Sequence, residues 1–112
     1  MSVTDSFNVS LSPVEALSLV KTGLSENAEL VHEELNNIGT NLSIGTLIYE
    51  RYFFRSGNQA GLVIIIDNLQ GVTNVRLIAV GSSNSLIFKI DWGAGKSFAS
   101  SAEKVLSSYI ID

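Results

Sequence analysis

The sequence predicts an α+β fold, in which a single antiparallel β-sheet packs against an N-terminal and a C-terminal helix. Four segments rich in β-branched and aromatic residues follow one another, and short turn signals separate them. Parallel neighbours would need long crossover connections, so these segments should form an antiparallel four-strand meander. A segment with helical spacing of apolar residues stands before the meander and another stands after it. The predicted strands are residues 42–54, 60–68, 72–80 and 85–91.

The N-terminal segment predicts a strand followed by a helix. Residues 7–11 alternate apolar and polar side chains, as a short strand does. Ser12, Pro13 and Glu15 then form a capping box with proline at the first helical position, which predicts a helix over residues 12–25. Residues 28–38 fit either a weak helix or a short edge strand, and we favour the strand. The meander would thus be joined by one or two short N-terminal strands.

The C-terminal segment predicts a helix that belongs to the core. Phe98, Ala102, Val105 and Tyr109 recur at helical spacing and form one apolar stripe. We expect Phe98, Val105 and Tyr109 to be mostly buried, with Ala102 between them. The order of elements, with helices on one face of one sheet, is the economical arrangement for a chain of this length.

Composition limits the classes of function. The 112 residues fit a single α+β domain over residues 1–112. The absence of cysteine excludes disulfides and thiolate metal sites. The start of the chain has no signal-peptide pattern, and the longest apolar run, residues 62–66, is too short to span a bilayer. We therefore expect a cytoplasmic protein with no membrane partner. A net charge of −4 without a basic cluster also makes nucleic acid a poor partner.

The chain is unusually apolar for a small soluble domain. Hydrophobic residues make up 46% of it and charged residues only 16%. Residues 62–66 are apolar at every position, whereas a strand with one solvated face alternates with polar residues. Helices can cover one face of this strand. The other face must be covered in another way, which predicts either a homodimer contact or a sheet that curls on itself.

Residues 91–98, DWGAGKSF, end in Gly95-Lys96-Ser97 and so resemble the end of a phosphate-binding P-loop. The full pattern needs a glycine five positions before Gly95, where the chain has Ile90. A P-loop also belongs to a parallel sheet, and this sheet should be antiparallel. We therefore interpret the glycines as a turn from strand to helix, with Ser97 helping to cap the helix. Lys96 and free backbone N–H groups could still hold a small anion.

Five residues are candidates for ligand binding, and no catalytic residue, metal ligand or cofactor can be singled out. The stretch YERYFFRSGN, residues 49–58, is the most polar and aromatic part of the sheet. Alternation places Tyr49 and Arg51 on one face and Glu50 on the other. Charged residues in mid-strand either face solvent or pair inside a pocket. The candidates are Tyr49, Arg51, Arg55, Trp92 and Lys96. The single histidine, His32, has no second imidazole to complete a metal site.

The segments GTLIYERYFFRSGNQAGLVIIIDN and FKIDWGAGKSF resemble a small uncharacterised bacterial family, a domain of unknown function found mainly in Gram-positive bacteria. The resemblance covers nearly the whole chain and implies no activity, substrate or catalytic residue. The order of elements also resembles a reduced helix-grip domain, in which a curved sheet wraps the last helix. That second similarity concerns the fold alone.

Two hypotheses about function follow. The first is a non-enzymatic module that binds a small apolar or anionic ligand under the C-terminal helix, or dimerises through an apolar sheet face. The second is a small enzyme in which Arg51, Glu50 and Lys96, or His32, form an acid/base or anion-binding site. A cleft in which Arg51 and Glu50 converge would favour the enzyme. The absence of a recognisable catalytic set favours the binding module.

Overall fold

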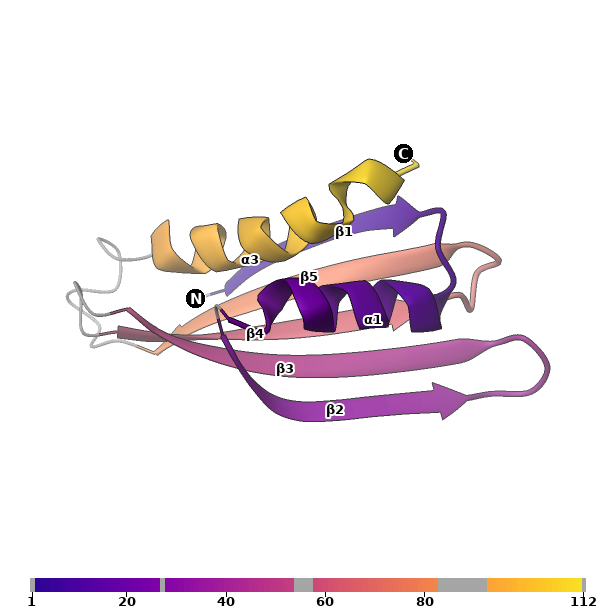
Figure 1. The fold of residues 1–112 in the computed structure, drawn as a ribbon, viewed down its shortest axis with the longest axis horizontal. Helices are drawn as coiled ribbons and strands as arrows, with labels where there is room; N and C mark the ends of the chain where they lie inside the picture. The colour runs from indigo at the N-terminus through magenta and orange to yellow at the C-terminus, as the bar shows by residue number, and fades with distance from the viewer. Residues whose placement is uncertain (1, 27, 54–57, 83–92, 112) are drawn as a thin grey trace.

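The computed structural model describes residues 2–26, 28–53, 58–82 and 93–111 of the chain. Two helices lie on one side of a single antiparallel sheet, which is the predicted α+β architecture (Figure 1). The strands are β1 (Ser2–Val9), β2 (Glu29–Asn37), β3 (Ser43–Phe53), β4 (Asn58–Asp67) and β5 (Thr73–Ser82). The helices are α1 (Pro13–Leu24) and α3 (Gly93–Leu106), and a short 3-10 turn, η1 (Ser107–Tyr109), follows α3.

The five strands lie in the order β1-β5-β4-β3-β2, and every neighbouring pair is antiparallel. The predicted meander is confirmed for β3, β4 and β5, and its fourth member, residues 85–91, lies outside the described residues. β1 pairs with β5 along its whole length, which local sequence did not indicate. This pairing explains why β1 covers residues 2–9, whereas alternation alone predicted a strand over residues 7–11.

Helix α1 begins and ends as its sequence predicts. The Ser12 hydroxyl accepts a hydrogen bond from the Glu15 backbone N–H, and the Glu15 carboxylate accepts one from the Ser12 N–H. This capping box satisfies two N–H groups that have no partner within the helix. The helix lies against β3 at Gly45, where an added Cβ would come within 2.5 Å of a methyl group of Leu17. Glycine at this strand position therefore lets the helix approach the sheet closely.

Helix α3 is part of the core, although its buried stripe differs from the predicted one. Phe98 and Ala102 are fully buried, as expected, but Tyr109 is 38% exposed and Leu106 is completely buried in its place. The α-helix ends at Leu106, and the chain continues through η1 with a tighter turn. The 3.6-residue period therefore stops before Tyr109. Val105 is partly buried against α1, where Gly23 leaves room for it.

The start of α3 also corrects the sequence interpretation. The helix begins at Gly93, so Gly93 and Gly95 lie within its first turn instead of forming a turn before it. Ser97 is the fifth residue of the helix and cannot be its N-cap. The side chains of residues 93–97 lie outside the described part of the structure, but their backbone is helical.

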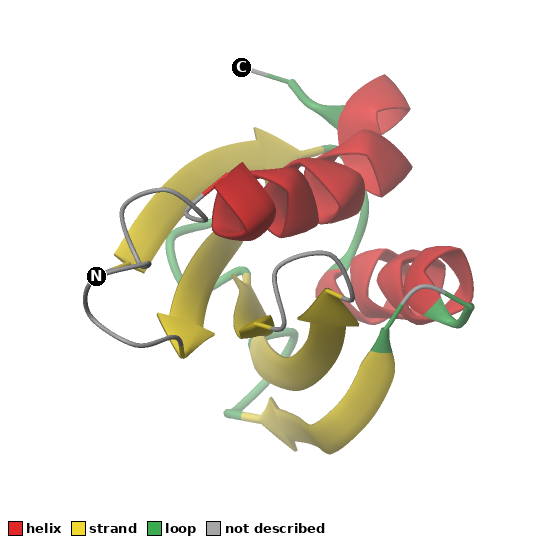
Figure 2. Ribbon diagram, turned by 90° about the vertical axis from the view of Figure 1, so that its left-hand side faces the viewer, coloured by secondary structure: helices red, strands yellow, loops and turns green. Residues whose placement is uncertain are grey.

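The core lies between the sheet and the two helices. One set of alternate side chains on β4, Leu62, Ile64 and Ile66, faces the helices and is completely buried. Partner residues on β3 and β5 continue this buried layer on either side. Figure 2 shows that the sheet curves around the helices, and that both helices lie on this one side. The layer is completed by Leu47, Tyr49, Val75, Leu77, Phe98 and Leu106.

Residues 28–38, which the sequence left between helix and strand, contain the edge strand β2. All nine of its residues are exposed, and it pairs only with β3 among the described strands. Glu33 and Glu34 stand side by side, so a carboxylate points to each face of the sheet. With a carboxylate on each side, neither face of this strand packs into the core. The edge-strand prediction is confirmed.

Candidate functional site

Of the residues proposed for ligand binding, Tyr49 and Arg51 are the two whose side chains the structure describes. Tyr49 is almost completely buried in the helix-covered layer, and burial, with a smaller effect from the charge of Glu33, raises the pKa of its hydroxyl. Arg51 has the same strand parity and pairs in register with buried Ala60, so it lies on the helix side as well. Glu50 is exposed on the opposite face. The alternation predicted for β3 is thus confirmed, and it keeps Glu50 and Arg51 apart.

Arg55 and Trp92 lie outside the described residues, and Lys96 is in the first turn of α3 with its side chain outside them. The glycine-rich stretch around Lys96 is helical, whereas a P-loop wraps a phosphate with a non-helical loop. The sheet is antiparallel throughout. Neither the local nor the global geometry of the described residues matches a nucleotide-binding P-loop.

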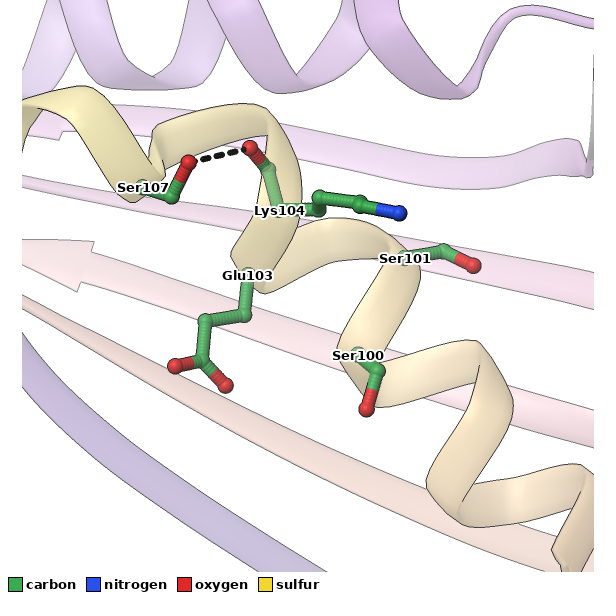
Figure 3. Close-up of a pocket in the computed structure, with 5 residues that line it drawn as sticks. All are labelled: Ser100, Ser101, Glu103, Lys104 and Ser107. Carbon is green, nitrogen blue, oxygen red and sulfur yellow. Dashed lines mark hydrogen bonds between the residues drawn. The ribbon is translucent and has the colours of Figure 1, made fainter.

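A hollow of about 460 Å³ lies against α3 (Figure 3). Its described lining comes from a single helix and the turn that follows it. Ser107 donates a hydrogen bond of 3.0 Å to the Lys104 carbonyl oxygen. Glu103 hydrogen-bonds to Asp5 on β1, and this bond, then burial, then the Asp5 charge, raise the pKa of Glu103. The lining residues are Ser100, Ser101, Glu103, Lys104 and Ser107.

A second hollow, of about 420 Å³, lies beside the turn between β4 and β5. Its walls include an ion pair in which Arg76 Nη2 lies 3.2 Å from Asp67 Oδ2. The other carboxylate oxygen of Asp67 accepts the Leu69 N–H, so the turn and the ion pair hold the same side chain. Asn74 bridges to β1 by donating to Asn8 Oδ1 at 3.0 Å. These bonds fasten the end of the sheet.

The largest feature without a structural explanation is the sheet face opposite the helices, which we call the bare face. Alternation places Val63 and Ile65 of β4 on it, and both are only partly buried. Val63 lies in register between Ile48 of β3 and Ile78 of β5, so three branched apolar side chains form a row across the central strands. No described helix covers this row (Figure 2). Val80 and Tyr52, farther along the same face, are 43% and 52% exposed.

Two kinds of site are not found in the described part of the chain. Its histidine, aspartate and glutamate residues form no group of three that could hold a metal ion. His32 lies 3.0 Å from Glu34 on the exposed edge strand, where the pair has no third ligand among these residues. Neither described helix has the length and apolar character needed to cross a bilayer.

The fold and these surfaces define the class of protein: a two-layer α+β domain with a packed interior, one bare apolar sheet face and one exposed sheet edge. Within that class, residues 3–110 match DUF6054, a family of unknown function, and the chain belongs to this family. The match spans both helices and all five described strands, so family and fold describe the same unit. A search of the curated proteins finds no match.

Proposed function

We propose that this protein is a non-enzymatic cytoplasmic interaction module that forms a homodimer through the bare face of its sheet. The observation that carries the proposal is the row of Ile48, Val63 and Ile78, with Ile65 beside it. Apolar patches on the surface of a folded domain commonly mark sites of interaction with another protein. A twofold contact covers one such patch with an identical one, which is the commonest arrangement among soluble oligomers.

The size and charge of the bare face suit a second copy. Five strands about 4.8 Å apart and about 10 residues long, at about 3.3 Å per residue, give a planar footprint of roughly 800 Å². A standard interface takes about the same area from each partner. The row of Ile48, Val63 and Ile78 is uncharged, and Arg76, which lies opposite Ile65, pairs with Asp67 on the same face. Interface centres are depleted of charge in the same way. Exposed Glu50 lies beside the row.

A small ligand under α3, the other form of the binding hypothesis, fits the geometry less well. The space between α3 and the sheet is taken by Phe98, Ala102 and Leu106, each completely buried, and by the strand residues against them. Interiors of this kind are close-packed and leave little room for a ligand. A ligand would have to displace core side chains, whereas a partner on the bare face displaces only water.

Sedimentation equilibrium over a concentration range from about 1 to 100 µM tests the dimer, since an interface of this size supports micromolar or tighter association. We expect the mass of two chains at the upper end. Val63→Lys should return the mass to one chain, because a twofold contact would bring two unpaired ammonium groups into an apolar interface.

Val14→Lys is the matched control. Val14 is 51% exposed on α1, on the other side of the molecule, so the same substitution there should leave the dimer intact. Circular dichroism must confirm that both variants remain folded. A wild-type mass of one chain at every concentration would exclude the homodimer and leave the bare face of a curled sheet in contact with water.

A further inference from the structure

The two edges of the sheet are treated differently by the rest of the chain. At the β1 edge, the C-terminal segment pairs with the strand end: Ser10 donates to the Tyr109 carbonyl oxygen at 2.9 Å, and Ile111 donates to the Asn8 carbonyl oxygen at 3.0 Å. Val9 and Ile110 form an antiparallel bridge between these two bonds. At the β2 edge, no described segment lies beyond the strand (Figure 1).

β2 is long enough to accept another strand. It spans nine residues, or about 30 Å, and presents a row of backbone N–H and C=O groups along its outer side. Natural edges of this length are usually shortened, covered or protected by charge. A bulge between Leu30 and His32 interrupts only the first part of its pairing with β3, and the register from His32 to Asn37 is regular.

The side chains of β2 define what an added strand should carry. Leu30 and Leu35 pair in register with Tyr49 and Gly45 on the helix side, and they are 37% and 42% exposed. Glu34 points to the bare-face side, where its carboxylate lies 3.0 Å from His32 Nε2. An added strand would place apolar residues against the leucines and its alternate residues against the carboxylate. Cross-strand pairs of opposite charge stabilise such a contact.

A second copy of β2 fits this edge poorly. The antiparallel register that overlaps the whole strand, residues 29–37, places Glu33 opposite its own copy. A change of register that moves the twofold axis of the strand pair to the next residue places Glu34 opposite its own copy. Like charges directly opposite each other destabilise a strand pair. Glu33 already binds Lys21 at 2.8 Å, which ties β2 to α1. Glu34 has no ion pair with a lysine or arginine in the described part of the chain.

We infer that β2 binds an extended basic peptide segment of a partner protein by strand addition, with apolar and basic residues alternating along that segment. Main-chain hydrogen bonds hold the added strand, Leu30 and Leu35 receive its apolar residues, and Glu34 pairs with a lysine or arginine. The main-chain contacts of this site lie along the rim of the sheet, whereas Glu34 lies on the same side of the sheet as the bare face. A dimer centred on β3, β4 and β5 would leave the main-chain groups of both β2 edges available.

An eight-residue peptide of alternating valine and lysine, labelled with a fluorophore, is the probe. We expect saturable binding by fluorescence anisotropy at low salt that weakens as salt rises, because charge pairing contributes. A peptide of alternating valine and glutamate should bind at least about tenfold more weakly, a difference of about 1.4 kcal/mol. Hydrogen exchange should show protection of the amides of residues 29–37 when the lysine peptide is bound.

Glu34→Lys should weaken binding of the lysine peptide at least about fivefold and improve binding of the glutamate peptide. The matched control joins Gln70→Lys with Ser108→Lys, two exposed positions away from β2 that change the net charge by the same amount. The control should bind as the wild type does. Equal loss in both variants would mean nonspecific attraction to an acidic protein and would overturn the inference. Protection that falls outside β2, or no difference between the two peptides, would overturn it as well.

Discussion

The two faces of β4 belong to the same ten residues, yet they have opposite environments. Leu62, Ile64 and Ile66 are completely buried under the helices, whereas Val63 and Ile65 are covered only by their neighbours within the sheet. Side-chain chemistry is nearly the same on both faces, so hydrophobicity cannot tell which face is the core. The positions of helices α1 and α3 decide which face is the core. An apolar strand therefore identifies two surfaces, and the placement of the helices decides which of them belongs to the core.

The largest effect should come from removing the side chain that anchors the covered face. Phe98 is completely buried, so Phe98→Ala should lower the free energy of unfolding by about 3–5 kcal/mol. Urea denaturation followed by circular dichroism measures this value. Val14→Ala, at a position 51% exposed, should stay within about 0.5 kcal/mol of the wild type. Similar losses in the two variants would mean that α3 does not anchor the core.

A matched pair on β4 compares the faces directly. Ile64→Ala should cost about 2–5 kcal/mol at any protein concentration, because Ile64 is completely buried within one chain. Ile65→Ala should cost less than about half as much in dilute protein. If the bare face is a dimer contact, the cost of Ile65→Ala should grow with protein concentration, since dimer formation stabilises only the folded state. Equal costs at low concentration would remove the distinction between the faces.

Removing the N-terminal cap of α1 should have a smaller effect on stability. It tests how much the cap contributes to a helix that covers the sheet. Ser12→Ala removes the hydroxyl that accepts the Glu15 N–H and should destabilise the protein by about 1 kcal/mol. Ser18→Ala, at an exposed position within the same helix, removes no cap and should be neutral or slightly stabilising. Thermal melts of the two variants under identical conditions give the comparison. A loss confined to Ser18→Ala would contradict the assigned cap.

The smallest effect concerns the contact between Glu103 of α3 and Asp5 of β1. Because the pKa of Glu103 is raised in the folded state, the folded protein binds this proton more tightly than the unfolded chain does. The resulting stabilisation is fully present below the unfolded pKa and is lost as the pH rises through the folded pKa. At neutral pH the two carboxylates repel each other across a partly exposed contact.

Glu103→Gln should therefore stabilise the protein at pH 7 by roughly 0.2–1 kcal/mol and reduce the pH dependence of stability in the acidic range. Denaturation curves collected between pH 3 and pH 7, about one unit apart, measure both effects. Glu26→Gln, at an exposed position beyond the end of α1, is the control and should change the stability at pH 7 by less than about 0.5 kcal/mol. Destabilisation of Glu103→Gln at pH 7 would contradict the repulsion.

Much of the fold could be predicted from local sequence because its signals are local. The capping box at Ser12 identifies the first residue of α1, and segments rich in β-branched and aromatic residues, separated by turn signals, indicate β3, β4 and β5. The place of β1 next to β5 could not be predicted, since it depends on pairing between segments far apart in the chain. The burial of Leu106 instead of Tyr109 was missed because a periodic stripe does not reveal where a helix ends.

The candidate site could be predicted only in part, for a similar reason. The unbroken apolar run at residues 62–66 indicates a second apolar face from the sequence alone. The polar residues around Tyr49 were poor guides, because alternation separates Glu50 from Arg51 and buries Tyr49 itself. The open edge at β2 was detectable in principle. Adjacent carboxylates at Glu33 and Glu34 indicate a strand with both faces in solvent, and an apolar residue beside them indicates an unmet contact.

The pairing of β1 with β5 has a consequence for the order in which the molecule folds. β3, β4 and β5 are joined by short turns and can pair early, whereas residues 2–9 must find residues 73–82 across most of the chain. Contacts between distant segments form slowly, because the intervening chain must first lose its freedom. During that interval β5 is itself an edge strand, open to any other extended chain. The newly synthesised protein is thus most prone to aggregate before β1 docks, and a chaperone that shields β5 would increase the yield of folded protein.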